Sequence, residues 1–344
     1  MEGIAERIPV YAQLHDFARK ECGAGTKAFY TDPELLVVNT LKTLNRWHID
    51  YPTVDYDVYN IEAEALGQKI VYSRGQNPVA DRTRPLIRNH RDLDKINTPD
   101  FSTEGRFPFV IRICSLFHEL TGLQPDLNFC APFTMAATIR GVEPLLMDFY
   151  EDPVFARDLL DRITEMVLIP WIQYMARLFP EARGICGSDA LSSLPIVNMD
   201  ILECWSTPYI LRLRETCGDK VYVPNWVGEH HLSSPEEMFD LKLKVCPRFL
   251  QGQDPDVAAI GPEVYTDYAE RRGVPLILGI GSSFLAQSPE KEVADRVKRY
   301  LRAGGRNGQF CIYFCNIDSA TPVENLKSAL RTIRQYGNLS DAEQ

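Results

Sequence analysis

The sequence has few of the features that mark membrane, secreted or nucleic-acid-binding proteins. Its apolar runs fall short of the roughly 18–20 residues that a membrane-spanning helix needs. Its nine cysteines, an odd number without short regular spacing, do not form the pattern of a disulfide framework. The 37 Lys and Arg residues are outnumbered by 47 Asp and Glu residues, and the net charge of −10 argues against a nucleic-acid partner.

The composition that is present is typical of a soluble globular protein. Apolar residues make up 45% and charged residues 24% of the 344 residues, enough to bury a large core. The opening "MEGIAERIPV" lacks the basic segment and the long apolar segment of a signal peptide. These observations predict a reduced, cytoplasmic protein without a membrane partner. The length allows two average domains or one barrel.

A capping residue followed by proline recurs along the chain and predicts helix starts. Asp, Ser or Thr can accept a hydrogen bond from an unpaired amide, and proline fits the first helical position. The pairs are Asp32-Pro33, Asp152-Pro153, Thr207-Pro208, Ser234-Pro235, Ser288-Pro289 and Thr321-Pro322. Ser234 with Glu237 and Thr321 with Glu324 also fit a capping box. Gly304 and Gly337 are expected to end two of these helices.

Short apolar runs alternate with these helices and predict buried parallel strands. The runs are 7–15, 49–57, 126–133, 183–189, 220–226, 248–254, 274–281 and 308–315. Eight strands that alternate with helices indicate an α/β protein of the (β/α)₈ TIM-barrel class, which we expect to form one domain over residues 1–344. The segment 67–87 is less helical and predicts a hairpin excursion before the third strand.

The barrel prediction selects one functional face. In such barrels the chemistry lies at the carboxyl ends of the strands. The side chains expected there are His15, Asp57, Asn60, Glu62, Cys130, Asp189, Asn225, Glu229, Asp254, Ser282, Cys315 and Asp318. Polar or sulfur-bearing residues at most strand ends favour an enzyme over a scaffold.

The segment "DYDVYNIEAEALG" carries four acids in ten residues, namely Asp55, Asp57, Glu62 and Glu64. Acids in a cleft can serve as a general acid or base, or as metal ligands. A solvated acidic turn that leads into a short helix is the alternative interpretation.

The segment "GEHH" at 228–231 offers imidazoles that can bind zinc. Adjacent residues on an extended chain point to opposite sides, so both rings would face one ion only if the chain turned there. A polar surface loop is the alternative. Nothing in the chain matches a zinc protease motif, a paired C-x-x-C spacing or a phosphate-binding loop.

Two further strand ends carry candidate residues. Cys311 and Cys315 lie on one face if the last strand continues that far, with Cys315 a possible thiolate ligand and Cys311 a small core residue. Asp189 is expected at the barrel mouth, where capping a helix is the competing explanation of its role.

An ordered set of segments resembles the uroporphyrinogen decarboxylase superfamily, and in particular its corrinoid-dependent methyltransferase branch. In chain order the segments are "RIPVYAQLHDFA", "YTDPELL", "EAEALG", "CAPFTMAATIRG", "GSDALSS", "STPYILRL" and "CNIDSATPVENLKSAL". The resemblance covers nearly the whole chain. It implies a (β/α)₈ barrel with a deep pocket at its carboxyl face.

The superfamily holds two chemistries. Its decarboxylases act without a cofactor and use an arginine-rich segment after the first strand and an aspartate after the second. In this chain Leu14, His15 and Ala18 lie near the positions where the arginines are expected, and Asp57 lies near the aspartate. A substrate with many carboxylates needs such cations, so the resemblance favours the other branch.

The methyltransferases bind zinc, activate a thiol on it and exchange a methyl group with a corrinoid carried by a separate protein. Their zinc ligands usually come from a His-x-Cys-Gly segment and a cysteine after the last strand, where Cys315 stands. In "PNWVGE" Asn225 and Val227 replace the first two ligands, and valine cannot bind a metal. The usual zinc site is therefore absent or rebuilt. A rebuilt site could draw on Glu62 or Glu64, His15, Glu229, Cys315 and His231, and the set expected to bind the metal is Cys315, Glu62 and His231.

The sequence therefore predicts an enzyme that moves a methyl group between a small substrate and a corrinoid (cobalamin) protein. The residues expected in catalysis are Asp57, Glu62, Asp189 and Cys315, and those expected to bind substrate are His15, Asn60, Asn225 and Ser282. A cofactor-free decarboxylase, a lyase with Asp57 as proton relay, is one alternative. A non-catalytic barrel that binds a tetrapyrrole or corrinoid is the other.

Overall fold

The computed structural model describes residues 7–338, which form two compact units. Unit 1 contains residues 7–23, 39–55 and 227–338. Unit 2 contains residues 24–38 and 56–226. The organisation as one domain stays a prediction.

Unit 1 is built on a parallel four-stranded sheet of order β1-β9-β8-β7. Its strands are β1 (Val10–Ala12), β7 (Leu250–Gln253), β8 (Leu276–Ile280) and β9 (Phe310–Phe314). Alternate residues of β8, such as Leu276 and Leu278, are fully buried. The face of the sheet that carries these two leucines packs against α14 (Pro262–Arg272) and α16 (Glu290–Gly304).

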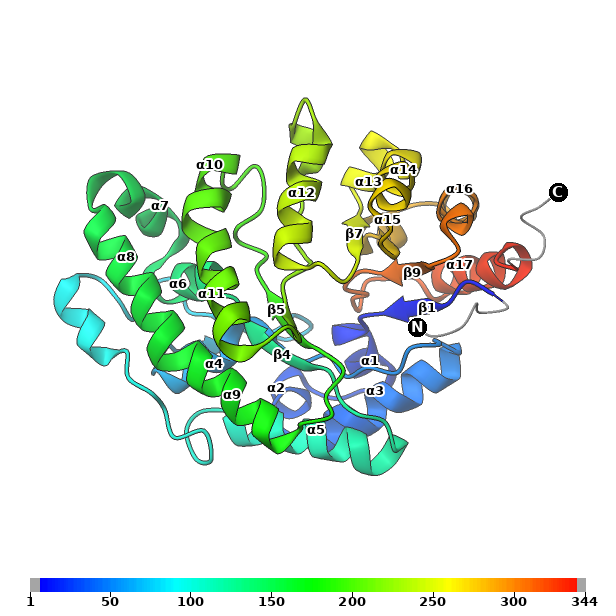
Figure 1. The fold of residues 1–344 in the computed structure, drawn as a ribbon. Helices are drawn as coiled ribbons and strands as arrows, with labels where there is room; N and C mark the ends of the chain where they lie inside the picture. Colours follow the sequence, from blue (N-terminus) through cyan, green and yellow to red (C-terminus); the bar gives the residue numbers. More distant parts are fainter. Residues whose placement is uncertain (1–6, 339–344) are drawn as a thin grey trace. The chain divides into compact units, whose positions relative to one another are not determined.

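The remaining helical segments of unit 1 lie between its strands along the chain or after the last of them (Figure 1). They are α1 (His15–Glu21), the 3₁₀ turn Glu229–His231, α12 (Pro235–Val245), α13 (Asp256–Ile260), α15 (Ser282–Gln287), the 3₁₀ turn Gly305–Asn307 and α17 (Val323–Tyr336). Helix α3 (Pro33–Trp47) begins in unit 2 and ends in unit 1. The strand–helix alternation agrees with the pattern predicted from the sequence.

Unit 2 contains a parallel three-stranded sheet of order β4-β5-β6 and a separate antiparallel pair, β2 with β3. These strands are β2 (Ile70–Val71), β3 (Val79–Ala80), β4 (Leu127–Cys130), β5 (Ile185–Ser188) and β6 (Val221–Tyr222). The β2–β3 pair confirms the hairpin expected within 67–87.

The helical segments of unit 2 include one long rod. They are α2 (Thr26–Phe29), the 3₁₀ turns Val58–Asn60 and His90–Lys95, α4 (Ile61–Ala65), α5 (Phe107–Thr121), α6 (Pro132–Arg140), α7 (Val142–Glu151), α8 (Pro153–Arg162), α9 (Ile169–Leu178), α10 (Met199–Ile201) and α11 (Thr207–Cys217). A π-helical turn, Ile163–Leu168, joins α8 to α9 so that the two continue as a single rod (Figure 1).

The sheet of unit 2 packs tightly around Gly187. A Cβ atom at this position would lie 2.6 Å from Phe129 Cζ and 2.7 Å from Val223 Cγ2. Both neighbours are about 1% exposed. We expect Gly187→Ala to lower the free energy of unfolding by about 1–3 kcal/mol through overpacking. Denaturant titration checks this, with Gly218→Ala in an open, exposed turn as a comparison of backbone strain alone.

The strand predicted at 49–57 is wrong. The amides of Asp50 and Tyr51 both donate to the Val10 carbonyl, at 3.1 and 3.2 Å, and the Asp50 carboxylate accepts from the Val10 amide at 2.9 Å. A side chain thus takes the place of a backbone acceptor, and Pro52 has no amide to continue a ladder. The other seven predicted runs each contain a strand.

The predicted helix starts are confirmed only in part. The carboxylates of Asp32 and Asp152 accept hydrogen bonds from first-turn amides of α3 and α8. At Thr207 the prediction is wrong, because α10 runs through a π-helical turn into α11 without an interruption. The side chains of Ser234 and Thr321 do not cap their helices, so neither capping box forms.

None of the helices in residues 7–338 combines the length and the apolar character needed to cross a membrane.

Candidate functional site

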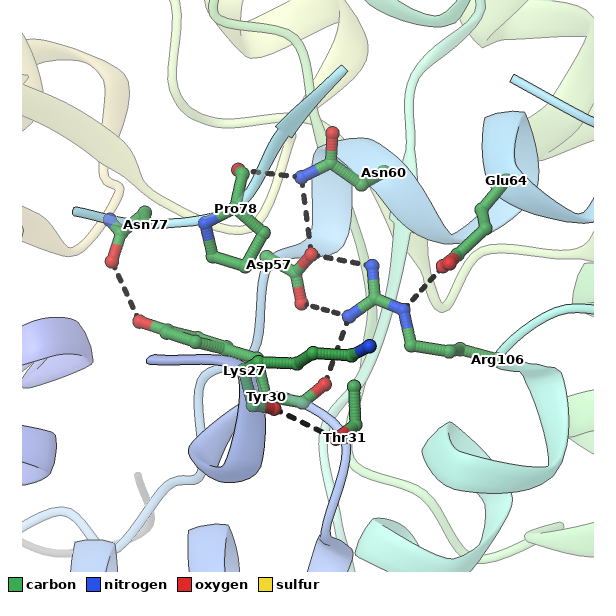
Figure 2. A network of polar contacts seen from close by, with 9 residues as sticks. All are labelled: Lys27, Tyr30, Thr31, Asp57, Asn60, Glu64, Asn77, Pro78 and Arg106. Carbon is green, nitrogen blue, oxygen red and sulfur yellow. Dashed lines mark hydrogen bonds and ion pairs between the residues drawn. The ribbon is translucent and has the colours of Figure 1, made fainter. Parts of the chain in front are cut away.

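The loop that precedes α4 is fixed by a buried ion pair between Asp57 and Arg106 (Figure 2). The two guanidinium nitrogens donate to the two carboxylate oxygens at 2.7 and 2.6 Å. Both residues are less than 10% exposed. Burial raises the pKa of Asp57, while the guanidinium acts in the opposite direction. A bidentate pair of this kind is geometrically specific and holds the carboxylate in place.

Further contacts use up the remaining polar atoms of this pair (Figure 2). Arg106 also donates to the Glu64 carboxylate and to the Tyr30 carbonyl, the latter at 3.1 Å. The Asn60 amide group donates to Asp57 at 3.1 Å and to the Pro78 carbonyl at 2.9 Å. Asp57 and Asn60, predicted respectively as catalytic and substrate-binding, are thus both committed to protein contacts.

The Asp57–Arg106 ion pair depends on the fork of donors that a guanidinium group provides. We expect Arg106→Lys to keep the positive charge but lose the paired donors, because an ammonium group has three donors on one nitrogen, whereas the guanidinium makes four hydrogen bonds from three nitrogens. The free energy of unfolding should fall by about 1–3 kcal/mol. Urea denaturation measures the loss. Arg112→Lys, on exposed and longer contacts to Glu34 and Glu119, should change stability by much less.

Glu62 is fully buried on the short helix α4 and has one oxygen without a partner. Its Oε1 accepts a hydrogen bond from the Cys130 amide at 3.1 Å. Its Oε2 is buried and contacts no hydrogen-bonding group in residues 7–338. Burial raises the pKa of Glu62 to about 8. At pH 7 this side chain is therefore a neutral carboxylic acid with a proton that it can donate.

Tyr59, Ser188 and Asn225 form a partly exposed polar group beside the ends of β5 and β6. The Asn225 side-chain oxygen accepts from the Asp189 amide at 3.0 Å, which turns its amino group toward the Tyr59 hydroxyl at 3.4 Å. Ser188 is a further hydrogen-bond partner of this hydroxyl, and burial raises the pKa of Tyr59. Neutral donors and acceptors at a strand end are suited to orienting a substrate.

The Asp189 carboxylate is saturated with hydrogen bonds from the protein. The donors are the Thr134 amide (3.0 Å) and hydroxyl (2.8 Å), the Ser192 hydroxyl, the Ser206 hydroxyl (2.7 Å) and the Trp226 indole N–H (3.0 Å). Thr134 lies in the first turn of α6, so Asp189 binds an amide at the start of that helix from outside it, whereas the N-cap residue of α6 is Ala131. The side chain is fully buried. Its lone pairs are committed to these five donors.

The strand ends of unit 1 carry an uncharged set of side chains. The Cys315 thiol donates to Gln253 Oε1 at 3.1 Å, and the Tyr313 hydroxyl donates to Gln13 Oε1. Burial raises the pKa of Cys315, so the sulfur is a thiol at neutral pH. Burial also lowers the pKa of His15 to about 4, with Asn316 as its hydrogen-bond partner. Ser282 is the first residue of α15.

The "GEHH" segment is a 3₁₀ turn rather than an extended chain. The rings of His230 and His231 are in contact at a tilt of 39°, with centroids 3.9 Å apart, so adjacency does not separate them as an extended chain would. His230 Nδ1 contacts the Asp256 carboxylate. Glu229, the residue before them, is fully buried and ion-paired with Lys242.

The side chains present do not fit the zinc site of the resembling methyltransferases. Within residues 7–338 no three His, Cys, Asp or Glu side chains are grouped so as to hold a metal ion. Zinc binds thiolate and imidazole, whereas Cys315 is a hydrogen-bonded thiol and Asn225 and Val227 stand at the other two positions. The set Cys315, Glu62 and His231 stays a prediction.

Arg106, Tyr59 and Ser188 belong to the site in unit 2 and were not expected from the sequence. Arg106 is the last residue of an irregular stretch, 97–106. No periodicity in this stretch indicates what its side chain contacts. Tyr59 lies in a 3₁₀ turn between Asp57 and Glu62, the acids that the sequence indicated as candidates. The density of polar residues in 55–67 was the available signal for Tyr59, and Arg106 had none.

Comparisons with known proteins agree on the family. The family described as "Uroporphyrinogen decarboxylase (URO-D)" matches residues 4–336. A curated uroporphyrinogen decarboxylase from Solibacter usitatus (strain Ellin6076) is 24% identical over 316 residues, which cover 88% of this chain and 84% of the relative.

A solved methyltransferase structure from Methanosarcina mazei superposes with a TM-score of 0.76 at 18% sequence identity. The superposition covers 96% of this chain and 95% of that chain. The likeness confirms the fold class predicted from the sequence, a (β/α)₈ barrel of the uroporphyrinogen decarboxylase type. Relatives of this fold, decarboxylase and methyltransferase alike, are enzymes. The chain belongs to the uroporphyrinogen decarboxylase (URO-D) family.

Proposed function

We propose that this chain transfers a methyl group from a small substrate to a corrinoid carried by a partner protein, with Glu62 as the general acid. The observation behind the proposal is the buried Oε2 of Glu62, which is unpartnered within residues 7–338, on a carboxyl group whose pKa is raised to about 8. A neutral acid held in this way can donate a proton at the operating pH.

The proton has a defined use in such a transfer. When the bond between the methyl carbon and its heteroatom breaks, the electron pair of that bond stays on the heteroatom. Glu62 can donate its proton to this atom, which leaves the substrate as a neutral molecule, and Glu62 regains a proton from water. The corrinoid, as co-substrate, accepts the methyl group. In the resembling methyltransferases zinc assists the reaction, and here an acid takes that role.

Tyr59 and Asn225 are proposed to orient the substrate. The Asn225 amide is held by the Asp189 backbone, so the Tyr59 hydroxyl that it contacts has a defined direction. Preorganised groups of this kind lower the cost of positioning a substrate. The fold shared with the Methanosarcina mazei methyltransferase and the segment "EAEALG" support this branch of the family.

A cofactor-free decarboxylase is the second candidate, which the name of the Solibacter usitatus relative favours. In that reaction Glu62 would protonate the carbon that CO₂ leaves. Asp57 is poorly suited to the role of proton relay, because both its oxygens are bound by Arg106.

Absorption spectroscopy of cob(I)alamin tests the proposal directly. The protein is mixed with cob(I)alamin, free or on a corrinoid protein, and with methoxyarenes or methylamines. Loss of the cob(I)alamin spectrum that depends on both protein and donor supports methyl transfer. Release of CO₂ from an acidic substrate without corrinoid would replace it with the decarboxylase. Stoichiometric binding of a corrinoid or tetrapyrrole without any turnover would indicate a non-catalytic barrel.

A further inference from the structure

An arginine-rich segment follows the β2–β3 pair of unit 2. Residues 82–91 contain four arginines and no acid, in a chain whose net charge is −10. The four side chains, which we call the arginine turn, are all exposed and are Arg82, Arg84, Arg88 and Arg91. Within residues 7–338 none of the four forms an ion pair. The segment therefore carries positive charge that the described part of the chain does not neutralise.

Arginines elsewhere in the chain are mostly ion-paired. Over residues 7–338, most arginines outside this segment contact a carboxylate. Exposed ones are included, such as Arg271 with Glu236 at 2.7 Å and Arg306 with Asp267 at 2.8 Å. Exposure alone therefore does not explain why four arginines within ten residues lack such a partner.

The acids that flank the arginine turn, or lie on the helices beside it, are bound by other groups. Their contacts are Asp81 with Thr83 (2.6 Å) and Lys69 (3.6 Å), Asp92 with Lys95 (2.6 Å), Asp94 with Arg162 (3.5 Å), Asp148 with Arg140 (2.7 Å) and Asp152 with His90 (2.8 Å). These carboxylates thus already have partners, and the four guanidinium groups are left to bind groups from outside.

Backbone contacts bring the four arginines onto one compact segment. Residues 81–84 form a turn that a hydrogen bond from the Arg84 amide closes at 3.2 Å. Arg88 Nε donates to the Pro85 carbonyl at 3.4 Å, so its guanidinium group lies beside the residue that follows Arg84. The Arg88 amide donates to a carboxylate at 2.8 Å and closes a second turn, 88–92, which contains the fourth arginine.

The segment is also held against the rest of unit 2. Gln68 is 2% exposed, donates to the Arg84 carbonyl at 3.3 Å and accepts from the Leu86 amide at 3.0 Å. Arg140, near the end of α6, donates to the Arg88 carbonyl at 2.9 Å. The backbone is thus ordered before any partner binds, which lowers the entropic cost of binding.

The chemistry of the arginine turn favours the acidic face of a protein over other anions. Small ligands bind in concave sites that bury most of their surface, unlike these exposed side chains. A nucleic acid would extend past ten residues and meet the acidic remainder of the chain. A membrane would be bound with the help of exposed apolar side chains, and no large one is exposed in 82–91. Guanidinium groups bind carboxylates through paired donors.

We propose that the arginine turn is a docking surface for the acidic face of a partner protein. The net charge of −10 repels such a partner from the rest of the chain, so the encounter is steered toward these four cations. Arginine is common at the energetic centres of protein interfaces, because its planar donors are only weakly hydrated. Docking of this kind does not depend on which reaction the barrel catalyses.

Fluorescence anisotropy with a fluorescein-labelled decaglutamate peptide tests the surface. The full chain is titrated at about 20 mM salt, where exposed charges are weakly screened. Removing the four charges together should weaken binding at least about tenfold, in a variant that combines Arg82→Gln, Arg84→Gln, Arg88→Gln and Arg91→Gln. A control with the same change of net charge should lose less than about twofold, and it combines Arg271→Gln, Arg272→Gln, Arg299→Gln and Arg306→Gln, all ion-paired in unit 1.

Chemical protection of the wild-type protein makes the test independent of how any variant folds. Phenylglyoxal modifies exposed arginines, and saturating decaglutamate should slow its reaction with the arginine turn severalfold. Arg302 on α16 is exposed and has no ion pair within residues 7–338, so its reaction should not slow. No detectable binding of decaglutamate, undiminished binding in the glutamine variant, or equal protection of Arg302 would overturn the surface.

Two further probes separate a protein partner from other anions. Tighter binding of a labelled oligothymidylate of equal charge would replace the protein partner by a nucleic acid. Tighter binding to phosphatidylserine vesicles would replace it by a membrane, and either result would overturn the proposal. None of these measurements uses a corrinoid or a methyl donor, so the docking surface and the methyltransferase proposal stand or fail separately.

Discussion

Replacing Glu62 by glutamine should lower kcat by about 10²–10⁴-fold, because glutamine keeps the shape of the side chain but has no acidic proton to donate. The side-chain oxygen of the introduced glutamine can still accept from the Cys130 amide, so the structure around it should persist. Single-turnover loss of the cob(I)alamin spectrum measures the effect. Unchanged turnover in Glu62→Gln would remove Glu62 from the mechanism.

The same substitution has a second effect that is independent of any substrate. The pKa of Glu62 is about 8 in the folded protein, against 4.5 for an unburied glutamate. Between these values the folded state holds a proton that the unfolded state has lost. Stability therefore falls as pH rises, by about 1.4 kcal/mol per pH unit and by about 5 kcal/mol in all. Above pH 8 Glu62 has lost its proton in the folded state as well, and the stability that this proton provided at low pH is gone.

Urea denaturation from pH 5 to pH 9 separates this contribution from others. Glu62→Gln should have a shallower decline with pH than the wild type and should be the more stable protein at pH 9. Glu64→Gln provides a matched control, since Glu64 lies on the same helix but is partly exposed and paired with Arg106. The control should keep the decline between pH 5 and pH 8. Parallel curves for wild type and Glu62→Gln would contradict the buried neutral acid.

Replacing Lys242 by methionine should lower the free energy of unfolding by about 3–5 kcal/mol, because it leaves the Glu229 carboxyl buried without its cation. Lys242 is 2% exposed and Glu229 is fully buried. The ammonium also donates to the Gln251 carbonyl at 2.8 Å, and that acceptor would be left without this donor. Few single substitutions in unit 1 should cost as much.

The pH dependence of the Lys242→Met variant follows from Glu229. Burial raises the pKa of Glu229 to about 7, and Lys242 opposes that rise. Without the ammonium the pKa rises further, so the folded variant holds its proton to higher pH. The penalty of Lys242→Met is therefore smallest below about pH 6, where Glu229 is protonated in both folded proteins, and grows as pH rises past 7.

Two companion variants identify the cause of the loss. Glu229→Gln combined with Lys242→Met removes both charges and should recover most of the stability. Lys244→Met, on the exposed side of the same helix, should change stability by less than about 0.5 kcal/mol. Thermal and urea denaturation report both. A double variant no more stable than Lys242→Met would mean that packing, and not the unpaired charge, causes the loss.

The sequence predicted the strands that repeat a simple pattern and failed where a single side chain replaced a backbone contact. Seven apolar runs became strands, but in the run 49–57 the Asp50 carboxylate takes the Val10 amide and Pro52 supplies no donor. A hydrophobic pattern does not record such a contact, because it depends on a residue 40 positions away.

The candidate site was predicted less fully, for a related reason. Glu62 and Glu64 are two residues apart on a five-residue helix, too short for periodicity to show which one is buried. Only the fold reveals that Glu62 lies against Cys130 and that Glu64 contacts Arg106. The replacement of zinc ligands by Asn225 and Val227 could be seen in the sequence. The hydrogen bond between Cys315 and Gln253 could not.

Asp189 ties together segments that are distant along the chain. Its donors include Thr134, 55 positions earlier, and Trp226, 37 positions later. Until those segments meet, the carboxylate cannot be both buried and satisfied, and burying it alone costs several kcal/mol. Partly assembled forms of unit 2 are therefore penalised, which makes folding of this unit more cooperative. In hydrogen exchange, the Thr134 amide should open together with the most protected amides of the unit rather than through local fraying.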